Sequence, residues 1–194
     1  MKNILKNRLA LSTVVTTLII LVVSVLLAGV VTYFAINVTS TRVQEESLQL
    51  TKLHVWSPSN GSSPQAAFLI INTGGRDVVI NKITVRGQSA DFETGTPAHP
   101  VYYAITSKAV SQDFNWTSAT MTSSPLINID GTSADDVALA QATKDLTLTS
   151  GNSMIVYISN PDSITVNDIG LTVGITVFTS QAMYYQEANV QAIS

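Results

Sequence analysis

An uncharged run of 33 residues, from Leu9 to Thr41, lies near the start of the chain. It contains no proline and a single glycine, Gly29, and most of its side chains are aliphatic. About 20 apolar residues are enough to cross a bilayer as a helix, and this run is longer than that. It therefore predicts one continuous helix from Leu11 to about Val38, which enters a membrane early in the life of the protein.

A short basic segment with Lys2, Lys6 and Arg8 precedes this run. The positive-inside rule keeps such a segment in the cytoplasm, so the residues after the helix should lie outside. All thirteen acidic residues of the chain come after the helix, against seven of its ten basic ones. This acidic balance excludes nucleic acid as an expected partner, because phosphates require basic patches. The chain has no cysteine, so the core alone must stabilise the folded part.

The residues after the helix predict a β domain, since they are poor in charge and rich in Val, Ile, Thr and Ser. Alternating segments between turn signals predict seven to nine short strands. The expected strands are 48–56, 66–72, 78–86, 101–105, 126–129, 145–148 and 154–158, followed by a hairpin of 170–178 and 182–190.

Two finer expectations follow from these patterns. In the strand 78–86, Val79, Ile83 and Val85 should share one face. The stretch 88–142 is the least regular and should form a surface elaboration with one or two extra strands. Glu45 and Glu46 should mark only the point where the chain meets water.

The predicted fold class is α+β: a long N-terminal hydrophobic α-helix followed by an Ig-like antiparallel β-sandwich, with a small barrel as the alternative. The expected organisation is a leader over 1–10, a helix over 11–45 and a β domain over 46–194. No internal repeat of fixed period is present.

No motif in the chain predicts catalysis. The two histidines, His54 and His99, are far apart in sequence, and we expect neither to be catalytic. Acidic residues cluster at 130, 135 and 136, and again at 162 and 168, but without the spacing of a calcium-binding loop. We therefore expect no enzyme activity, no cofactor and no metal site.

One stripe of the predicted helix has small or hydroxyl-bearing side chains at separations of three, four or seven residues. Such stripes let two helices approach closely in an apolar medium. We expect this stripe to be the packing face of the helix, and its members are Thr13, Thr17, Ser24, Ala28, Thr32 and Ala35.

Three glycosylation sequons begin at Asn37, Asn60 and Asn115. An external domain exposes such sites to modification. Asn60 and Asn115 lie in loop-like contexts and are the better candidates, because Asn37 falls within the predicted helix.

The N-terminus resembles that of the archaeal type IV pilin superfamily, which includes adhesion pilins and archaellins. The residues that show it are Lys6-Asn7-Arg8-Leu9-Ala10, then Leu11-Ser12-Thr13-Val14-Val15-Thr16-Thr17 and the aliphatic run to Ile36. Leu9 departs from the family, which usually has a charge at that place. The resemblance implies cleavage by a dedicated prepilin peptidase between Ala10 and Leu11.

The resemblance also implies a function. In this family an assembly ATPase and a membrane platform protein drive subunits from the membrane into a filament, whose core is made of their helices. The expected function is thus a structural subunit of an extracellular filament, a homopolymer used for adhesion or surface contact. Two alternatives remain open: an archaellin of a motility filament, and a membrane-anchored surface protein that does not polymerise.

Overall fold

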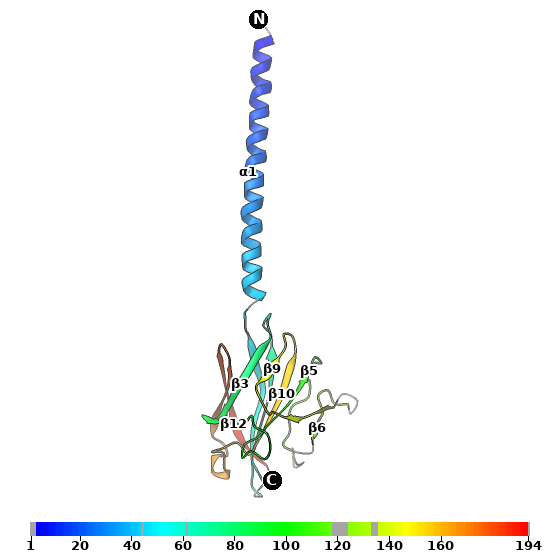
Figure 1. The fold of residues 1–194 in the computed structure, drawn as a ribbon, viewed down its shortest axis with the longest axis vertical. Helices are drawn as coiled ribbons and strands as arrows, with labels where there is room; N and C mark the ends of the chain where they lie inside the picture. Colours follow the sequence, from blue (N-terminus) through cyan, green and yellow to red (C-terminus); the bar gives the residue numbers. More distant parts are fainter. Residues whose placement is uncertain (1–2, 44, 61, 118–123, 133–135, 194) are drawn as a thin grey trace. The chain divides into compact units, whose positions relative to one another are not determined.

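The computed structural model describes residues 3–43, 45–60, 62–117, 124–132 and 136–193. The chain divides into two units, which meet between Gln44 and Glu45. The first is a helix and the second is built from strands (Figure 1). This confirms the predicted class, a long apolar helix followed by a mostly antiparallel β domain.

The first unit is the helix α1 (Asn3–Val43). It is longer at both ends than the segment 11–38 that the apolar run predicted. The β-branched residues that crowd it are only moderate helix formers in water. In an apolar medium they remain helical, because each backbone N–H and C=O group must find its partner within the segment.

The second unit contains one large sheet and a small one. Its longer strands are β1 (Leu48–Pro58), β2 (Gln65–Asn72), β3 (Val78–Val85), β5 (Val101–Thr106), β10 (Ser153–Ser159), β11 (Thr172–Thr179) and β12 (Met183–Ile193). The short ones are β4 (Gln88–Ser89), β6 (Leu126–Ile127), β7 (Val137–Ala138), β8 (Ala140–Gln141) and β9 (Leu146–Leu148), together with the 3-10 helix η3 (Val166–Asp168). The large sheet has the order β4-β3-β11-β12-β1-β2-β10-β5-β8, with β9 beside β3, and β6 pairs with β7.

The strand β12 links the two halves of the large sheet. Its first seven residues form the predicted antiparallel hairpin with β11. Its last four pair in parallel with β1, Val190 opposite Val55. Because β12 is longer than β11, its end extends past the hairpin and is free to take a second partner. This parallel pairing is the one departure from antiparallel order in the described sheets.

The main core lies between these two halves. Alternate residues of β11, namely Val173, Ile175 and Val177, are buried. They belong to one apolar cluster with residues of the opposite half, such as Phe68 of β2 and Val156 of β10. The two halves therefore pack face to face as a sandwich.

The predicted inward face of β3 was wrong at Val79. That side chain is exposed, while Val78, Ile80, Ile83 and Val85 are buried. The register explains this: consecutive residues of β11 pair with Lys82 and Ile80, so β3 has one extra residue between them. Such a bulge resets the alternation and lets Ile80 and Ile83 both face the core.

The stretch 88–142 is more than a surface elaboration. Its described part forms β4 to β8 and contributes five buried side chains to a second apolar cluster, namely Tyr102 and Ala104 of β5 and Phe114, Ile129 and Leu139 outside it. This cluster covers the outer face of β2, β10 and β5, where Leu69 and Ile155 are also buried. The strand β2 is therefore covered on both faces, with Phe68 in one cluster and Leu69 in the other.

Candidate functional site

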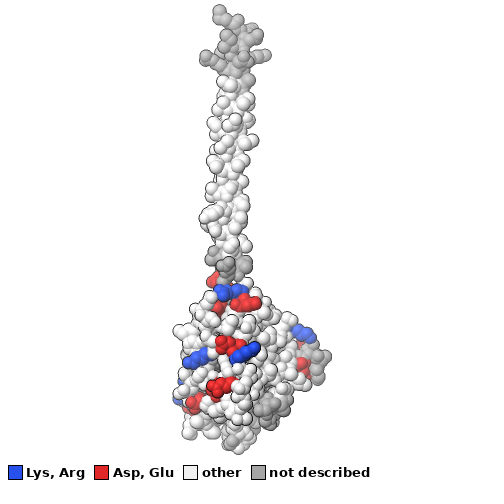
Figure 2. All heavy atoms as spheres, viewed as in Figure 1, with Lys and Arg blue, Asp and Glu red and all other residues white. Residues whose placement is uncertain are grey.

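The helix α1 presents a long apolar surface. The segment from Leu11 to Ser40 has a mean hydropathy of 2.9 and is long and apolar enough to cross a membrane. Every side chain in this segment is exposed in the single chain. Figure 2 shows no charged residue along this segment, whereas charges are scattered over the β domain. Such a surface needs a lipid or protein partner.

The hydroxyl groups of α1 are compatible with an apolar partner. Thr16 donates to the carbonyl of Ser12 at 2.9 Å and Thr17 to that of Val14 at 2.9 Å. Ser24 donates to Ile20 at 2.7 Å and Thr32 to Ala28 at 2.8 Å. Because each donor is satisfied on its own helix, burying these side chains leaves no unpaired O–H group.

The predicted packing stripe lies along this exposed surface. Its six members are all exposed: Thr13, Thr17, Ser24, Ala28, Thr32 and Ala35. Ala10 and Leu11, the predicted cleavage residues, lie within the helical backbone. Contact between helices and cleavage both stay predictions.

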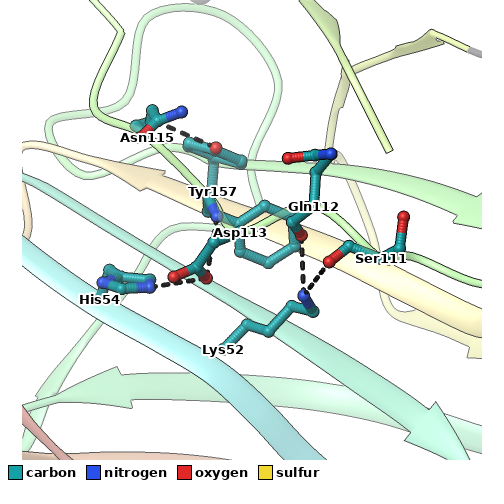
Figure 3. Close-up of polar contacts among 8 residues, drawn as sticks. Lys52, His54, Ser111, Gln112, Asp113, Asn115 and Tyr157 are labelled. Atoms are coloured by element: carbon teal, nitrogen blue, oxygen red, sulfur yellow. Dashed lines mark hydrogen bonds and ion pairs between the residues drawn. The ribbon is translucent and has the colours of Figure 1, made fainter. Parts of the chain in front are cut away.

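The described residues of 107–139 that cover the outer face of β2, β10 and β5 are called the outer layer. A polar cluster ties this outer layer to the sheet (Figure 3). Lys52 adopts a left-handed backbone conformation, with φ of 52°, where the register of β1 against β2 shifts. Its ammonium group donates to the carbonyls of Ser111 at 3.0 Å and Gln112 at 2.8 Å. Two residues further on, His54 Nε2 lies 2.9 Å from Asp113 Oδ1. The bulge in β1 thus positions two side chains that hold the segment 111–113.

Charge and hydrogen bonding set the protonation state of Asp113. Burial raises the pKa of this carboxyl, but the hydrogen bond and charge of His54, the Phe114 N–H at 3.0 Å and the charge of Lys52 outweigh that effect. The net result is a pKa below the ordinary value, so the carboxylate is ionised near neutral pH. The ionised Asp113 can therefore hold the segment 111–113 against His54 of the sheet.

The two histidines lie in different settings. The ring of His54 stacks on Trp56 with 5.2 Å between centroids, and its Nε2 is engaged by Asp113. His99 Nδ1 lies 2.6 Å from the carbonyl oxygen of Asn160. Within the described ranges no three His, Asp or Glu side chains are grouped as a metal site requires. Residue 135 of the first acidic cluster lies outside those ranges.

A second polar cluster closes the turn after β3. Arg86 donates to Asp168 Oδ1 at 2.7 Å and to the carbonyl of Ser163 at 3.0 Å. The backbone N–H and hydroxyl of Thr165 both donate to Asp168 Oδ2 at 2.8 Å. These hydrogen bonds from Thr165, followed by that from Arg86, lower the pKa of Asp168. The two members of the predicted acidic pair therefore differ: Asp168 is buried and accepts these hydrogen bonds, whereas Asp162 is exposed.

Glu46 has a role that the sequence did not indicate. One of its carboxylate oxygens accepts from the hydroxyl of Thr179 at 2.5 Å and from that of Tyr184 at 3.4 Å. Burial, followed by the charge of Glu46, raises the pKa of Tyr184. The expectation that Glu46 only marks where the chain meets water was wrong. No local pattern could reveal the contact, because more than 130 residues separate its partners.

The sequons lie in different settings. Asn60 is exposed in the turn after β1, and its Oδ1 accepts from the N–H of Ser62 at 3.1 Å. Asn37 lies within α1, in the apolar segment. Asn115 is exposed in the outer layer, where its carbonyl accepts from the hydroxyl of Tyr157 at 3.2 Å.

A cavity of about 200 Å³ lies beside Asn115, lined by residues of 113–117 and 126–128 and by Tyr157. Tyr157 is one of the largest fully buried side chains, and burial raises the pKa of its hydroxyl. Figure 3 shows its hydrogen bond to Asn115 next to the Lys52 and His54 tethers. The cavity therefore sits where the outer layer is fastened to the sheet.

No protein-family model matches this chain, and no curated protein matches it. Among solved structures, the ligand binding region of Serine-glutamate repeat protein A (SgrA) of Enterococcus faecium is similar at a TM-score of 0.30 and 12% sequence identity. The similarity covers 78% of this chain and 99% of that one. A similarity at this level does not indicate a shared function.

Proposed function

We propose that this protein is the structural subunit of an extracellular filament of the archaeal type IV pilus kind, used for adhesion or surface contact. The observation that supports it most is the segment from Leu11 to Ser40, which is uncharged and wholly exposed in the single chain, and whose Ser24 and Thr32 hydroxyls donate to their own helix. Such a helix is suited to a lipid bilayer before assembly and to packing against identical helices afterwards.

The physical argument rests on what the exposed helix would cost outside the membrane. Burying a large aliphatic side chain is worth about 1.5–3 kcal/mol relative to water. With so many aliphatic side chains exposed, a subunit drawn out of the bilayer is stable only if neighbouring helices cover its surface. The core of a filament provides that cover, and the β domains then form the outside of the filament.

The route to the filament follows from the same proposal. The basic leader stays in the cytoplasm, and a prepilin peptidase cleaves between Ala10 and Leu11. An assembly ATPase and a platform protein in the membrane then add the subunit to the growing filament. Thr13, Thr17, Ser24, Ala28, Thr32 and Ala35 form the face along which the helices approach closely.

Shearing fibres from the cell surface tests this proposal directly. We expect electron microscopy to show fibres that contain this chain, with Leu11 as the first residue by N-terminal sequencing. A surface protein that retains Met1 and never enters a fibre would instead be a membrane anchor, and would contradict the proposal. A deletion strain separates the uses of the fibre, because loss of attachment supports adhesion and loss of swimming supports motility.

A further inference from the structure

The cavity beside Asn115 has the size of a site for one small ring. Its volume of about 200 Å³ is below the roughly 300–1,000 Å³ of pockets that hold drug-sized ligands. It is nevertheless much larger than the space of one water molecule, which is about 30 Å³. Apolar and aromatic residues, Trp116, Leu126 and Tyr157, line it together with the polar residues Asp113 and Asn128.

The polar groups around the cavity are of two kinds. Asp113 accepts from His54 and from the N–H of Phe114, and Asn128 Oδ1 accepts from the N–H of Gly131 at 2.6 Å. These oxygens have further lone pairs available. In contrast, the indole N–H of Trp116 is buried and has no hydrogen-bond partner among the described residues. Because that nitrogen is inaccessible, a molecule in the cavity would meet the ring of Trp116 and not its N–H group.

A ligand that suits this site has hydroxyls that donate hydrogen bonds and one apolar face. The hydroxyls would donate to the Asp113 and Asn128 oxygens. The apolar face would pack on the aromatic and aliphatic side chains. A sugar ring has this combination, whereas an anion would be repelled by the carboxylate of Asp113.

We propose that this cavity binds one sugar ring, and that the ring is the first residue of a glycan attached to Asn115. Asn115 begins the sequon Asn115-Trp116-Thr117, is exposed and itself lines the cavity. A ring linked to it is held beside the site at a high effective concentration. The inference rests on the proposed function in one respect, that the β domain is delivered outside the cell. Asn60 is exposed too but does not line this cavity.

The first experiment uses the full-length chain purified from its own host, with a matched pair of variants. Thr117→Ser keeps the sequon, and Thr117→Ala removes it without touching Asn115. We expect mass spectrometry to find a glycan on Asn115 in the native chain and in Thr117→Ser only. We also expect Thr117→Ala to lower the melting temperature in detergent by about 3 °C, on the scale of one seated group in a chain of this size.

Three controls separate a seated glycan from other effects. The difference between Thr117→Ala and Thr117→Ser should vanish in chains made in a host without N-glycosylation. Ser62→Ala, which removes the other sequon but keeps Asn60 and its turn hydrogen bond, should remove the glycan of Asn60 with no change in melting temperature. Trp116→Ala should keep the glycan, because the sequon is intact, yet lose most of the stabilisation, because the ring surface against which the sugar packs is gone.

The second experiment identifies the source of the sugar. Full-length chain without glycan is mixed with glucose, galactose or N-acetylglucosamine, and saturation-transfer NMR reports binding. If Asn115 is unmodified in the native host, signals that Trp116→Ala abolishes support the site with an external glycan as its occupant.

Two results would overturn the sugar site. One is an unmodified Asn115 together with no saturation transfer from any of the three sugars. The other is a glycan on Asn115 whose removal shifts the melting temperature no more than removal at Asn60. Neither result affects the filament proposal, since fibres can form without this site. Conversely, a glycan seated in the cavity of a chain that forms no fibres would contradict the filament proposal alone.

Discussion

Asp168 shows how single residues fasten the loops of the β domain. It lies at the end of η3 and receives hydrogen bonds from Thr165 and Arg86. The sequence grouped it with Asp162 as part of an acidic cluster, whereas the structure makes it the centre of a closed turn. Its protonation therefore matters for stability.

The pKa of Asp168 predicts a change of stability with pH. Because that pKa is lower in the folded chain than the ordinary 3.8, its contribution is complete above 3.8 and is lost as the pH falls through the lower value. We expect Asp168→Asn to lower the urea midpoint of unfolding at pH 7. In acid, the difference in urea midpoint between this variant and the unmodified chain should become smaller. Asp162→Asn, at an exposed carboxyl, is the control, and an equal loss in the two variants would contradict the prediction.

Two glycines predict opposite tolerance to a methyl group. A Cβ at Gly74 would meet the backbone carbonyl of Glu45 at 2.6 Å and the backbone N of Ser47 at 2.7 Å. The three atoms nearest to a Cβ at Gly174 would all belong to the side chain of Tyr185, which is 58% exposed and can swing aside. We expect Gly74→Ala to lower the free energy of unfolding by about 2 kcal/mol, as overpacking does, and Gly174→Ala by much less. Urea unfolding of both variants measures this, and a larger loss at Gly174 would contradict it.

At the scale of elements, α1 combines two kinds of surface. Large aliphatic side chains occupy most of it, and the stripe from Thr13 to Ala35 is lined with small ones. Hydroxyls within the stripe, at Thr17, Ser24 and Thr32, donate to their own helix. The stripe can therefore meet a neighbouring helix at short distance without stranding a donor.

This surface predicts a position-dependent effect of bulk. Ala28→Trp should prevent fibre assembly, because the indole keeps two helices apart, while leaving membrane insertion intact because the segment stays apolar. Leu26→Trp, on the bulky face, should assemble. Fibre yield by electron microscopy and membrane fractionation measure the two properties, and normal fibres from Ala28→Trp would contradict close packing at the stripe.

At the scale of the whole molecule, the chain divides its tasks between two units. The helix exposes its apolar residues, and the β unit buries its own in two clusters, one on each face of β2. The second unit contains no cysteine and takes its stability from these clusters and the polar tethers around them. Its core is complete without the helix.

This division predicts that residues 45–194 fold alone. The fragment should be soluble and monomeric, with a single cooperative unfolding transition, because its buried clusters lie within the unit. The full chain should need detergent, lipid or a fibre. Analytical ultracentrifugation and calorimetry of the fragment test this, and a fragment without a cooperative transition would contradict it.

The sequence by itself determined the helix and the hairpin of β11 and β12. A helix that faces lipid must be long, apolar and uncharged, and a hairpin needs alternation on either side of a short turn, so both depend on neighbours along the chain. The cleavage between Ala10 and Leu11 is likewise predicted from sequence and awaits its test.

Only the tertiary structure decided which faces of the strands are covered. The bulge between Ile80 and Lys82, the burial of Phe114 and Leu139 over the sheet, and the contact of Glu46 with Thr179 join residues that are far apart or out of phase. Local alternation shows the period of a strand but not what packs on it. For the same reason the cavity beside Asn115 could not be foreseen, since it exists only where the outer layer meets Tyr157.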